Sequence, residues 1–408
     1  MSKCLLAIYL FISVSCLAGA EGISKAKNAI LFIGDGMGPT VLQATRLQFK
    51  GVRGSLPIDR FPHVAKVKTY CRDKIVTDSG AGASAMATGQ KVPYSTLSTR
   101  LPKDFQLAET DEAIRQHQGE PIPTLVELAA AKGKRTGLVT TTEVFDATPA
   151  AFYAHVSHRK NFAKIFSDLA VSPLHLLMGG GWLEVSRHQK ELAETLKLMK
   201  GLSGVRRKCR KNRVIGVFAD EDLPSALVTK GKGKLSLPRL TEVAIDCLQA
   251  EGGFFLMIEN EEVDQTLHLR KIPAALHATY ELNLAVEKAI EVLKKKGLLE
   301  ETLILFTADH DTGGLAVNGP VPDEGIWNQK MEIHSSKGSG SYRGPEYKVA
   351  RMSTDRDTWP EGISPLNLKT SHTAADVDLY ARGPGAEQVH GVMENTQIFN
   401  IIKSALEL

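Results

Sequence analysis

The sequence predicts an α/β fold in which helices flank both faces of a large, mostly parallel central sheet. Short apolar runs of strand length alternate along the chain with longer helical patterns, which is typical of strand–helix–strand units. The runs are continuously apolar, as expected for strands that are buried on both faces of a parallel sheet. Most of the candidate functional residues follow directly after these runs.

The expected elements follow one another in a regular order. Strands are expected at residues 29–33, 136–140, 174–178, 214–218, 253–258 and 302–306. Helices are expected at residues 41–49, 121–134, 238–250, 272–296 and 395–408, and a helix of small residues is expected from Gly80 onward. The 272–296 segment ends in three lysines followed by Gly297, which suits a helix terminus.

Two stretches interrupt this order. The basic run from Arg206 to Arg213 is interpreted as a solvated loop. The stretch from Gly319 to Ser371 is rich in Gly, Pro, Ser and charged residues and has little periodicity. It is expected to be a surface excursion that serves as a lid or a subunit contact.

The N-terminal residues predict an export signal. Lys3 precedes the apolar segment 4–17, and Ala18-Gly19-Ala20 fits a cleavage site, so residues 1–20 are expected to be a signal peptide. Residues 21–408 then form one catalytic domain in the periplasm or outside the cell. Lipid attachment at Cys16 is the alternative, and only in that case would the protein be held at a membrane.

Composition excludes several classes of protein. The chain has 408 residues and a net charge of +4, which is too small to indicate a nucleic-acid partner. Signal removal would leave Cys71, Cys209 and Cys247, which allow at most one internal disulfide. No two of these three lie within four residues of each other, so a zinc knuckle is excluded.

Oxygen ligands and imidazoles recur after the apolar runs. They are Asp35, then Asp146 and Thr148, then Glu259, Asp264 and His268, and finally Asp309 and His310. Ligands of α/β proteins bind outside the carboxyl ends of the strands. One such residue would be a turn or cap residue, but the recurrence at four strand ends predicts a single site.

The spacing of two residues predicts a metal site. Asp264 and His268 are four residues apart and would share one face of a helix. Together they could bind zinc, with His372 as a plausible third ligand. The adjacent Asp309 and His310 could hold a second metal. For each histidine alone, a structural role is the competing interpretation.

A second group of residues offers only oxygen. Asp35, Thr148 and Glu259, with Asp146 nearby, suit the octahedral coordination that Mg²⁺ prefers. Arg159 follows and could bind two phosphate oxygens at once. A surface arginine without such a role is the alternative.

The stretch from Val76 to Gly89 is nearly free of bulky side chains. Thr77, Asp78 or Ser79 could cap a helix there, and a serine at a helix N-terminus lies beside free N–H groups that attract anions. Ser79 is therefore either a nucleophile or the cap of a tightly packed helix.

These residues resemble the alkaline phosphatase family over nearly the whole mature chain. Matching stretches are Asn28 to Gly38, Val76 to Gly89, Asp146 to Ala150 with Arg159, Met178 to Gly181, the spacing of Glu259, Asp264 and His268, Thr307 to His310, and Ser371 to Thr373. The resemblance implies a phosphate monoester hydrolase that is active at alkaline pH, with two Zn²⁺ and one Mg²⁺ per chain, and a homodimer.

The resemblance also implies individual roles. Ser79 would form a phosphoserine intermediate, and Arg159, steadied by Asp78, would clamp the phosphate. One zinc would be bound by Asp264, His268 and His372, and the other by Asp35, Asp309 and His310. Asp35 would bridge to Mg²⁺, whose direct ligands would be Thr148 and Glu259, with Asp146 acting through bound water.

One position departs from relatives, because Gln265 stands where some of them place Lys or His near the phosphate. Weaker phosphate binding is therefore expected. The competing functions are a phosphodiesterase, sulfatase or phosphomutase of the same superfamily, and a non-catalytic exported protein that binds metal or phosphate. Side-by-side rates on an aryl phosphate, its diester and its sulfate would separate the enzymes.

Overall fold

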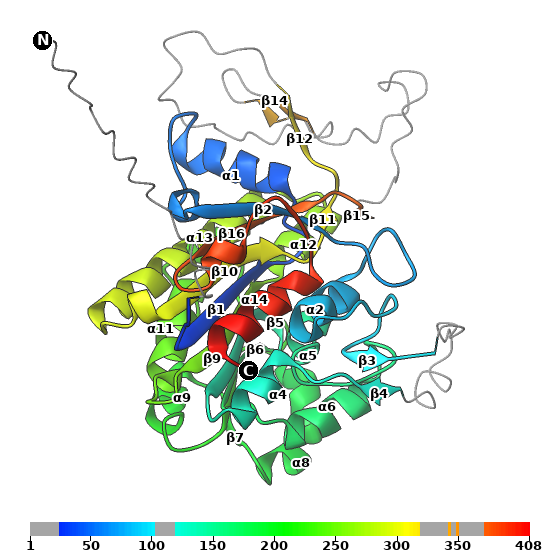
Figure 1. The fold of residues 1–408 in the computed structure, drawn as a ribbon, viewed down its shortest axis with the longest axis vertical. Coiled ribbons are helices and arrows are strands. Elements are labelled where there is room, and N and C mark those ends of the chain that lie inside the picture. The colour runs from blue at the N-terminus through cyan, green and yellow to red at the C-terminus, as the bar shows by residue number, and fades with distance from the viewer. Residues whose placement is uncertain (1–23, 103–118, 319–341, 344–347, 351–370) are drawn as a thin grey trace, which may run out of the picture.

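A ten-stranded sheet forms the centre of the molecule, in the order β17-β2-β16-β10-β1-β9-β5-β6-β8-β7 (Figure 1). The computed structural model describes residues 24–102, 119–318, 342–343, 348–350 and 371–408. The predicted α/β architecture with a mostly parallel sheet is confirmed.

Seven neighbouring strands of this sheet are parallel to one another. They are β10 (Thr302–Ala308), β1 (Asn28–Gly34), β9 (Phe254–Asn260), β5 (Arg135–Glu143), β6 (Leu176–Gly180), β8 (Val214–Val217) and β7 (Lys197–Met199). Every residue of β1, β9 and β10 is buried, as the continuous apolar runs predict. At the other end, β16 (Val377–Arg382) runs antiparallel to β10 and β2 (His63–Lys68), and β17 (Val392–Glu394) is parallel to β2.

Two groups of helices cover the two faces of the sheet (Figure 1). On one face α13 (Ile272–Lys295) packs against α11 (Leu237–Leu248) and α1 (Pro39–Lys50). On the other face α14 (Thr396–Leu406) packs against α2 (Ser79–Thr88) and α4 (Leu125–Ala131). The remaining helices are α5 (Ala147–Ala150), α6 (Phe162–Val171), α7 (Trp182–Val185), α8 (Gln189–Ala193), α9 (Leu202–Lys208), α10 (Ala226–Thr229) and α12 (Glu262–His268).

The helix expected at 121–134 is shorter than predicted. Glu120–Pro121 instead forms β4, which pairs with β3 (Thr99–Arg100). The helix begins at Leu125 because Thr124 caps it, with its hydroxyl accepting from the backbone N–H of Glu127 and the Glu127 carboxylate accepting from the N–H of Thr124.

The interpretation of the basic run 206–213 as a solvated loop is wrong in part. Residues 206–208 are the last turn of α9. Arg213 is half-buried, and its guanidinium donates to the carbonyl oxygens of Ser172 and Leu174. Through Arg213, which directly precedes β8, the run is therefore hydrogen-bonded to the loop before β6.

A disulfide joins Cys209 to Cys247, and Cys71 is a buried free thiol. Among the described residues, no helix has the length and apolar character that crossing a membrane requires. Residues 1–23 lie outside the described part. So does most of the Gly319 to Ser371 excursion, apart from the backbone of β13 (Tyr342–Arg343) and β14 (Lys348–Ala350), which join β12 (Ala316–Asn318) in a small sheet, and Ser371.

Candidate active site

Ser79 is the first residue of α2, and Asp78 is the residue that caps this helix. The Asp78 carboxylate accepts from the backbone N–H groups of Gly80, at 3.2 Å, and Ala81, at 3.3 Å. It also accepts from the N–H of Ser95 at 2.9 Å, which holds the neighbouring loop against the helix. Ser79 is only 4% exposed. Of the three capping candidates Thr77, Asp78 and Ser79, the structure shows that Asp78 is the cap. The Ser79 hydroxyl does not cap the helix and makes other contacts.

The small residues of α2 allow the end of β10 to approach the helix closely. A Cβ atom at Gly82 would lie 3.2 Å from both the Cβ and the carbonyl oxygen of Asp309, tighter than an ordinary contact. Gly36, after β1, has a φ of +65°, and a Cβ there would lie 2.5 Å from Asp264 Oδ1. Glycine at these positions lets three strand ends converge on Ser79.

A first group of ligand-type side chains surrounds the Ser79 hydroxyl. Ser79 Oγ lies 3.3 Å from Asp35 Oδ1 and 3.3 Å from His310 Nε2. His310 Nε2 in turn lies 3.3 Å from Asp35 Oδ1 and 3.2 Å from Asp309 Oδ2. One ligand atom from each of Asp35, Asp309 and His310 lies within 4.8 Å of the others, and all three residues are buried.

A threonine fixes the ring of His310. Thr312 Oγ1 has one proton and donates it to Asp264 Oδ1, so it can only accept from His310 Nδ1, 3.3 Å away. The Nδ1 atom therefore bears the proton, and the lone pair of Nε2 faces Asp35 and Asp309. Burial lowers the pKa of His310 well below its usual range, which favours this neutral ring.

These buried acceptors suit a cation. Asp309 Oδ2 is buried and accepts no hydrogen bond from the described residues. Burial and the neighbouring Asp309 and Asp264 carboxylates raise the pKa of Asp35 well above its usual value, and burial likewise raises the pKa of Asp309. Crowded buried carboxylates of this kind are compensated by divalent cations in proteins.

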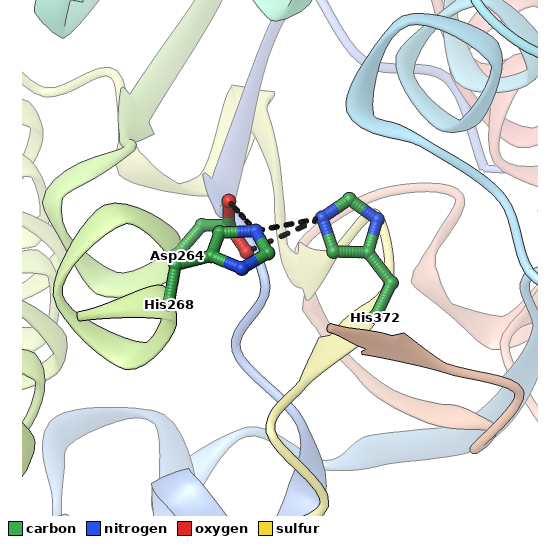
Figure 2. A group of neighbouring side chains, drawn as sticks. All are labelled: Asp264, His268 and His372. Carbon is green, nitrogen blue, oxygen red and sulfur yellow. Dashed lines mark hydrogen bonds and ion pairs between the residues drawn. The ribbon is translucent and has the colours of Figure 1, made fainter. Parts of the chain in front are cut away.

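The second group consists of Asp264 and His268, one turn apart on α12, and His372 on β15 (His372–Thr373). Figure 2 shows the three side chains pointing toward one another. His268 Nε2 lies 3.1 Å from both Asp264 Oδ2 and His372 Nε2. The contacts of Asp264 with the two histidines hold the pKa of its carboxyl well below its usual range, although burial alone would raise it.

The position of His372 is set by the backbone beside α2. Its Nδ1 atom lies 2.9 Å from the carbonyl oxygen of Thr77, which can only accept. In the neutral ring the proton therefore sits on Nδ1, and the Nε2 lone pair faces His268 Nε2 and Asp264 Oδ1. The donor set of two imidazoles and one carboxylate fits a zinc site.

A third group offers mainly oxygen. Thr148 Oγ1 donates to Asp35 Oδ2 at 3.3 Å, on the side opposite to Ser79. Glu259, which is fully buried at the end of β9, accepts from Thr140 Oγ1 at 2.6 Å through Oε2. Its Oε1 atom has no hydrogen-bond partner among the described residues. Burial raises the pKa of Glu259, and an oxygen-binding cation would compensate this buried charge.

Arg159 lies between two carboxylates. Its guanidinium contacts Asp78 Oδ2 at 3.3 Å and Asp146 Oδ1 at 3.1 Å. Burial lowers the pKa of Arg159, but the charges of Asp146, Asp78 and Asp35 outweigh it and raise the pKa. The predicted pairing of Arg159 with Asp78 is present, and Asp146 contacts Arg159 as well.

The sequence analysis missed three polar residues that orient the site. Thr312 links the two groups, Thr140 binds Glu259, and Asp222 accepts from Gln265 Nε2 at 2.8 Å. Thr312 lies on β11 (Asp311–Thr312), two residues after His310. Its closeness to the His310 ring could therefore have been predicted from the sequence. Asp222 and Gln265 are 43 positions apart, and no spacing rule relates them.

Comparison with known proteins gives a consistent result. A family model described as alkaline phosphatase matches residues 26–181 and 185–408. Alkaline phosphatase 3 of Bacillus subtilis is 30% identical over 444 residues, which cover 94% of this chain and 89% of that protein. Alkaline phosphatase 4 of the same organism is 29% identical over 449 residues, which cover 96% and 91%. The solved structure of alkaline phosphatase from the Antarctic bacterium TAB5 matches with a TM-score of 0.70 and 23% identity, covering 94% of this chain and 99% of that one.

Proposed function

Because this chain belongs to the alkaline phosphatase family, we propose that it is an exported, metal-dependent phosphatase that hydrolyses phosphate monoesters through a phosphoserine formed on Ser79. The observation that carries the proposal is the position of Ser79 Oγ. It lies at the N-terminus of α2, 3.3 Å from both Asp35 Oδ1 and His310 Nε2. A hydroxyl in this setting has the ligand-type neighbours and the helix terminus that phosphoryl transfer needs.

The two groups of ligand-type residues would each hold a zinc ion. One set is Asp35, Asp309 and His310, and the other is Asp264, His268 and His372. Thr148, Glu259 and Asp35 would hold Mg²⁺, and Asp146, two residues before Thr148, would act through bound water. The bound metals would supply Lewis acidity that stabilises anionic oxygens on either side of the phosphorus.

The protein residues would then act in a defined order. Arg159 binds the phosphate dianion, and Asp78 orients both the guanidinium and the start of α2. Ser79 Oγ bonds to phosphorus as the bond from phosphorus to the ester oxygen breaks, and the alcohol leaves with the proton that Ser79 gives up. Water then displaces Oγ, one of its protons returns to Ser79, and inorganic phosphate departs. Two in-line displacements at one phosphorus give overall retention of configuration.

Export is supported by the N-terminal sequence and by the disulfide. Residues 1–20 have the charge, apolar core and small-residue site of a signal peptide. The pairing of Cys209 with Cys247 is typical of proteins that fold in an oxidising compartment. Edman sequencing of the secreted chain, with a start near Glu21, would test this part of the proposal.

The test of the activity is a rate comparison. The purified protein should hydrolyse an aryl phosphate faster than its diester or sulfate, and Ser79→Ala should abolish turnover while metal content is unchanged. Two zinc and one magnesium per chain, with activity lost to a chelator and restored by the metals, are expected. A faster diester would make the protein a phosphodiesterase, and full turnover by Ser79→Ala would contradict the phosphoserine.

A further inference from the structure

A patch of cations lies at the end of the sheet where the parallel strands begin, opposite to the candidate active site. We call it the rear basic patch. It consists of Arg207, Lys208, Arg210 and Lys211, around the end of α9, and Lys294 and Lys295, at the end of α13. In Figure 1, α9 lies on the lower left, away from α12 and β15.

A single carboxylate joins the two basic runs in space. Asp246 on α11 contacts Arg206 Nη2 through Oδ2, at 3.2 Å, and Lys296 Nζ through Oδ1, at 2.7 Å. Arg206 and Lys296 are the neighbours of the patch residues in the sequence. The two basic runs therefore lie on either side of Asp246. Its two carboxylate oxygens are already paired with Arg206 and Lys296, so Asp246 does not neutralise the six patch residues.

The end of α9 and the turn after it, which together carry four of the patch residues, are held in place. Cys209, within it, is bonded to Cys247 of α11. Arg135 donates to the carbonyl oxygens of Cys247, at 2.9 Å, and Arg210, at 3.0 Å. Asn212 donates through Nδ2 to the carbonyl oxygen of Lys208 at 3.1 Å. The backbone is thus fixed while its cationic side chains project outward.

These cations have no side-chain partner in the part of the chain that the structure describes. All six patch side chains are exposed, and within the described ranges none of them forms an ion pair or a side-chain hydrogen bond. A favourable interaction with the helix dipole explains lysines in the last turns of α9 and α13. It does not explain Arg210 and Lys211, which follow the end of α9.

We infer that the rear basic patch docks the protein on a membrane surface that contains anionic phospholipids. Clusters of four to eight Lys and Arg residues are attracted to the negative potential of such surfaces. Docking at this end would leave the catalytic end facing the solution. Nucleic acid fits less well, because neither basic run contains an aromatic side chain on which bases could stack.

The test is co-sedimentation of the full mature protein with vesicles. Binding is expected to phosphatidylglycerol mixed with phosphatidylcholine, and not to phosphatidylcholine alone. Raising the salt from about 0.01 M to about 1 M should release the protein, because the screening length falls about tenfold. The Lys208→Gln, Arg210→Gln, Lys211→Gln triple variant should bind on the order of a hundredfold more weakly, at about fivefold per cation.

A matched control removes the same net charge elsewhere. Lys232→Gln, Lys234→Gln and Lys271→Gln change three exposed lysines outside the patch, and this variant should bind vesicles like the parent. Aryl phosphate turnover should be unchanged in both variants, which shows that they fold. The inference is overturned if the parent protein does not bind anionic vesicles, or if the patch variant and the control variant lose vesicle binding equally. Binding of the parent to single-stranded DNA but not to vesicles would also overturn it.

Discussion

His372 Nδ1 lies 2.9 Å from the carbonyl oxygen of Thr77, two residues before Ser79. The contact joins one of the two ligand groups to the start of α2. It also fixes which imidazole nitrogen is free to bind a metal, since a carbonyl oxygen can only accept. The proposed nucleophile and the more distant ligand group are therefore positioned by the same short segment of backbone.

Thr312 should control metal binding without being a ligand. Its hydroxyl donates to Asp264 and accepts from His310, so Thr312→Val should leave both misaligned. Loss of such an outer contact typically weakens metal affinity about 10- to 100-fold. Zinc titration with a competing chelator measures this, and Thr312→Ser, which keeps the hydroxyl, should bind zinc like the parent. Equal affinity in the valine variant would contradict the assignment.

Gln265 should weaken the binding of product phosphate. A positive charge at this position would attract the anion, so Gln265→Lys should lower the inhibition constant for inorganic phosphate. In the structure Gln265 Nε2 donates to Asp222 Oδ2, and this carboxylate would also pair with a lysine. The Asp222→Asn, Gln265→Lys double variant should therefore bind phosphate more tightly than Gln265→Lys alone. Unchanged inhibition in both variants would refute the idea.

The disulfide should contribute measurably to stability. Cys209 and Cys247 are separated by 38 positions, for which the loop-entropy relation gives about 4 kcal/mol. The Cys209→Ser, Cys247→Ser variant should unfold at lower urea concentration than the parent. A reducing agent should bring the parent to the midpoint of the variant and leave the variant itself unmoved. A parent that is insensitive to reduction would argue against the bond.

Glu281 should make stability fall with rising pH. Burial raises its pKa from 4.5 to about 7, although hydrogen bonds from Leu237 and Thr229 oppose the shift. The folded state therefore retains this proton in a range where the unfolded state has lost it. Stability from the protonated side chain is complete below the unfolded pKa and is lost as the pH rises through about 7, by up to about 3 kcal/mol.

The measurement is urea unfolding of the parent and of Glu281→Gln across this range. The glutamine keeps the acceptor for both donors and cannot ionise. The variant should match the parent near the unfolded pKa and exceed it at alkaline pH. A difference between the two proteins that does not change with pH would assign the effect to packing.

The sequence predicted six strands of the ten-stranded sheet, namely β1, β5, β6, β8, β9 and β10, because their continuous apolar runs are local, and it did not predict β2, β7, β16 and β17. The run that became β1 is apolar throughout, and all seven of its residues are buried. The helix at 121–134 was predicted too long, because its helical periodicity does not reveal that Pro121 pairs with Thr99 in a small sheet. The basic run 206–213 was misjudged for a related reason, since the carbonyl groups that bind Arg213 come from the loop before β6.

By itself, the sequence determined the fold class and the residue types of the candidate site. The reason is that the burial of a strand and the point where it ends depend on the polarity of residues that are adjacent in the sequence. Only the tertiary structure decided how these residues meet. The approach of His372 to His268, 104 positions away, depends on the placement of β15 beside α12. The direction of the imidazole lone pairs depends on Thr312 and on the carbonyl oxygen of Thr77. Such contacts arise from packing between distant segments, which no local pattern encodes.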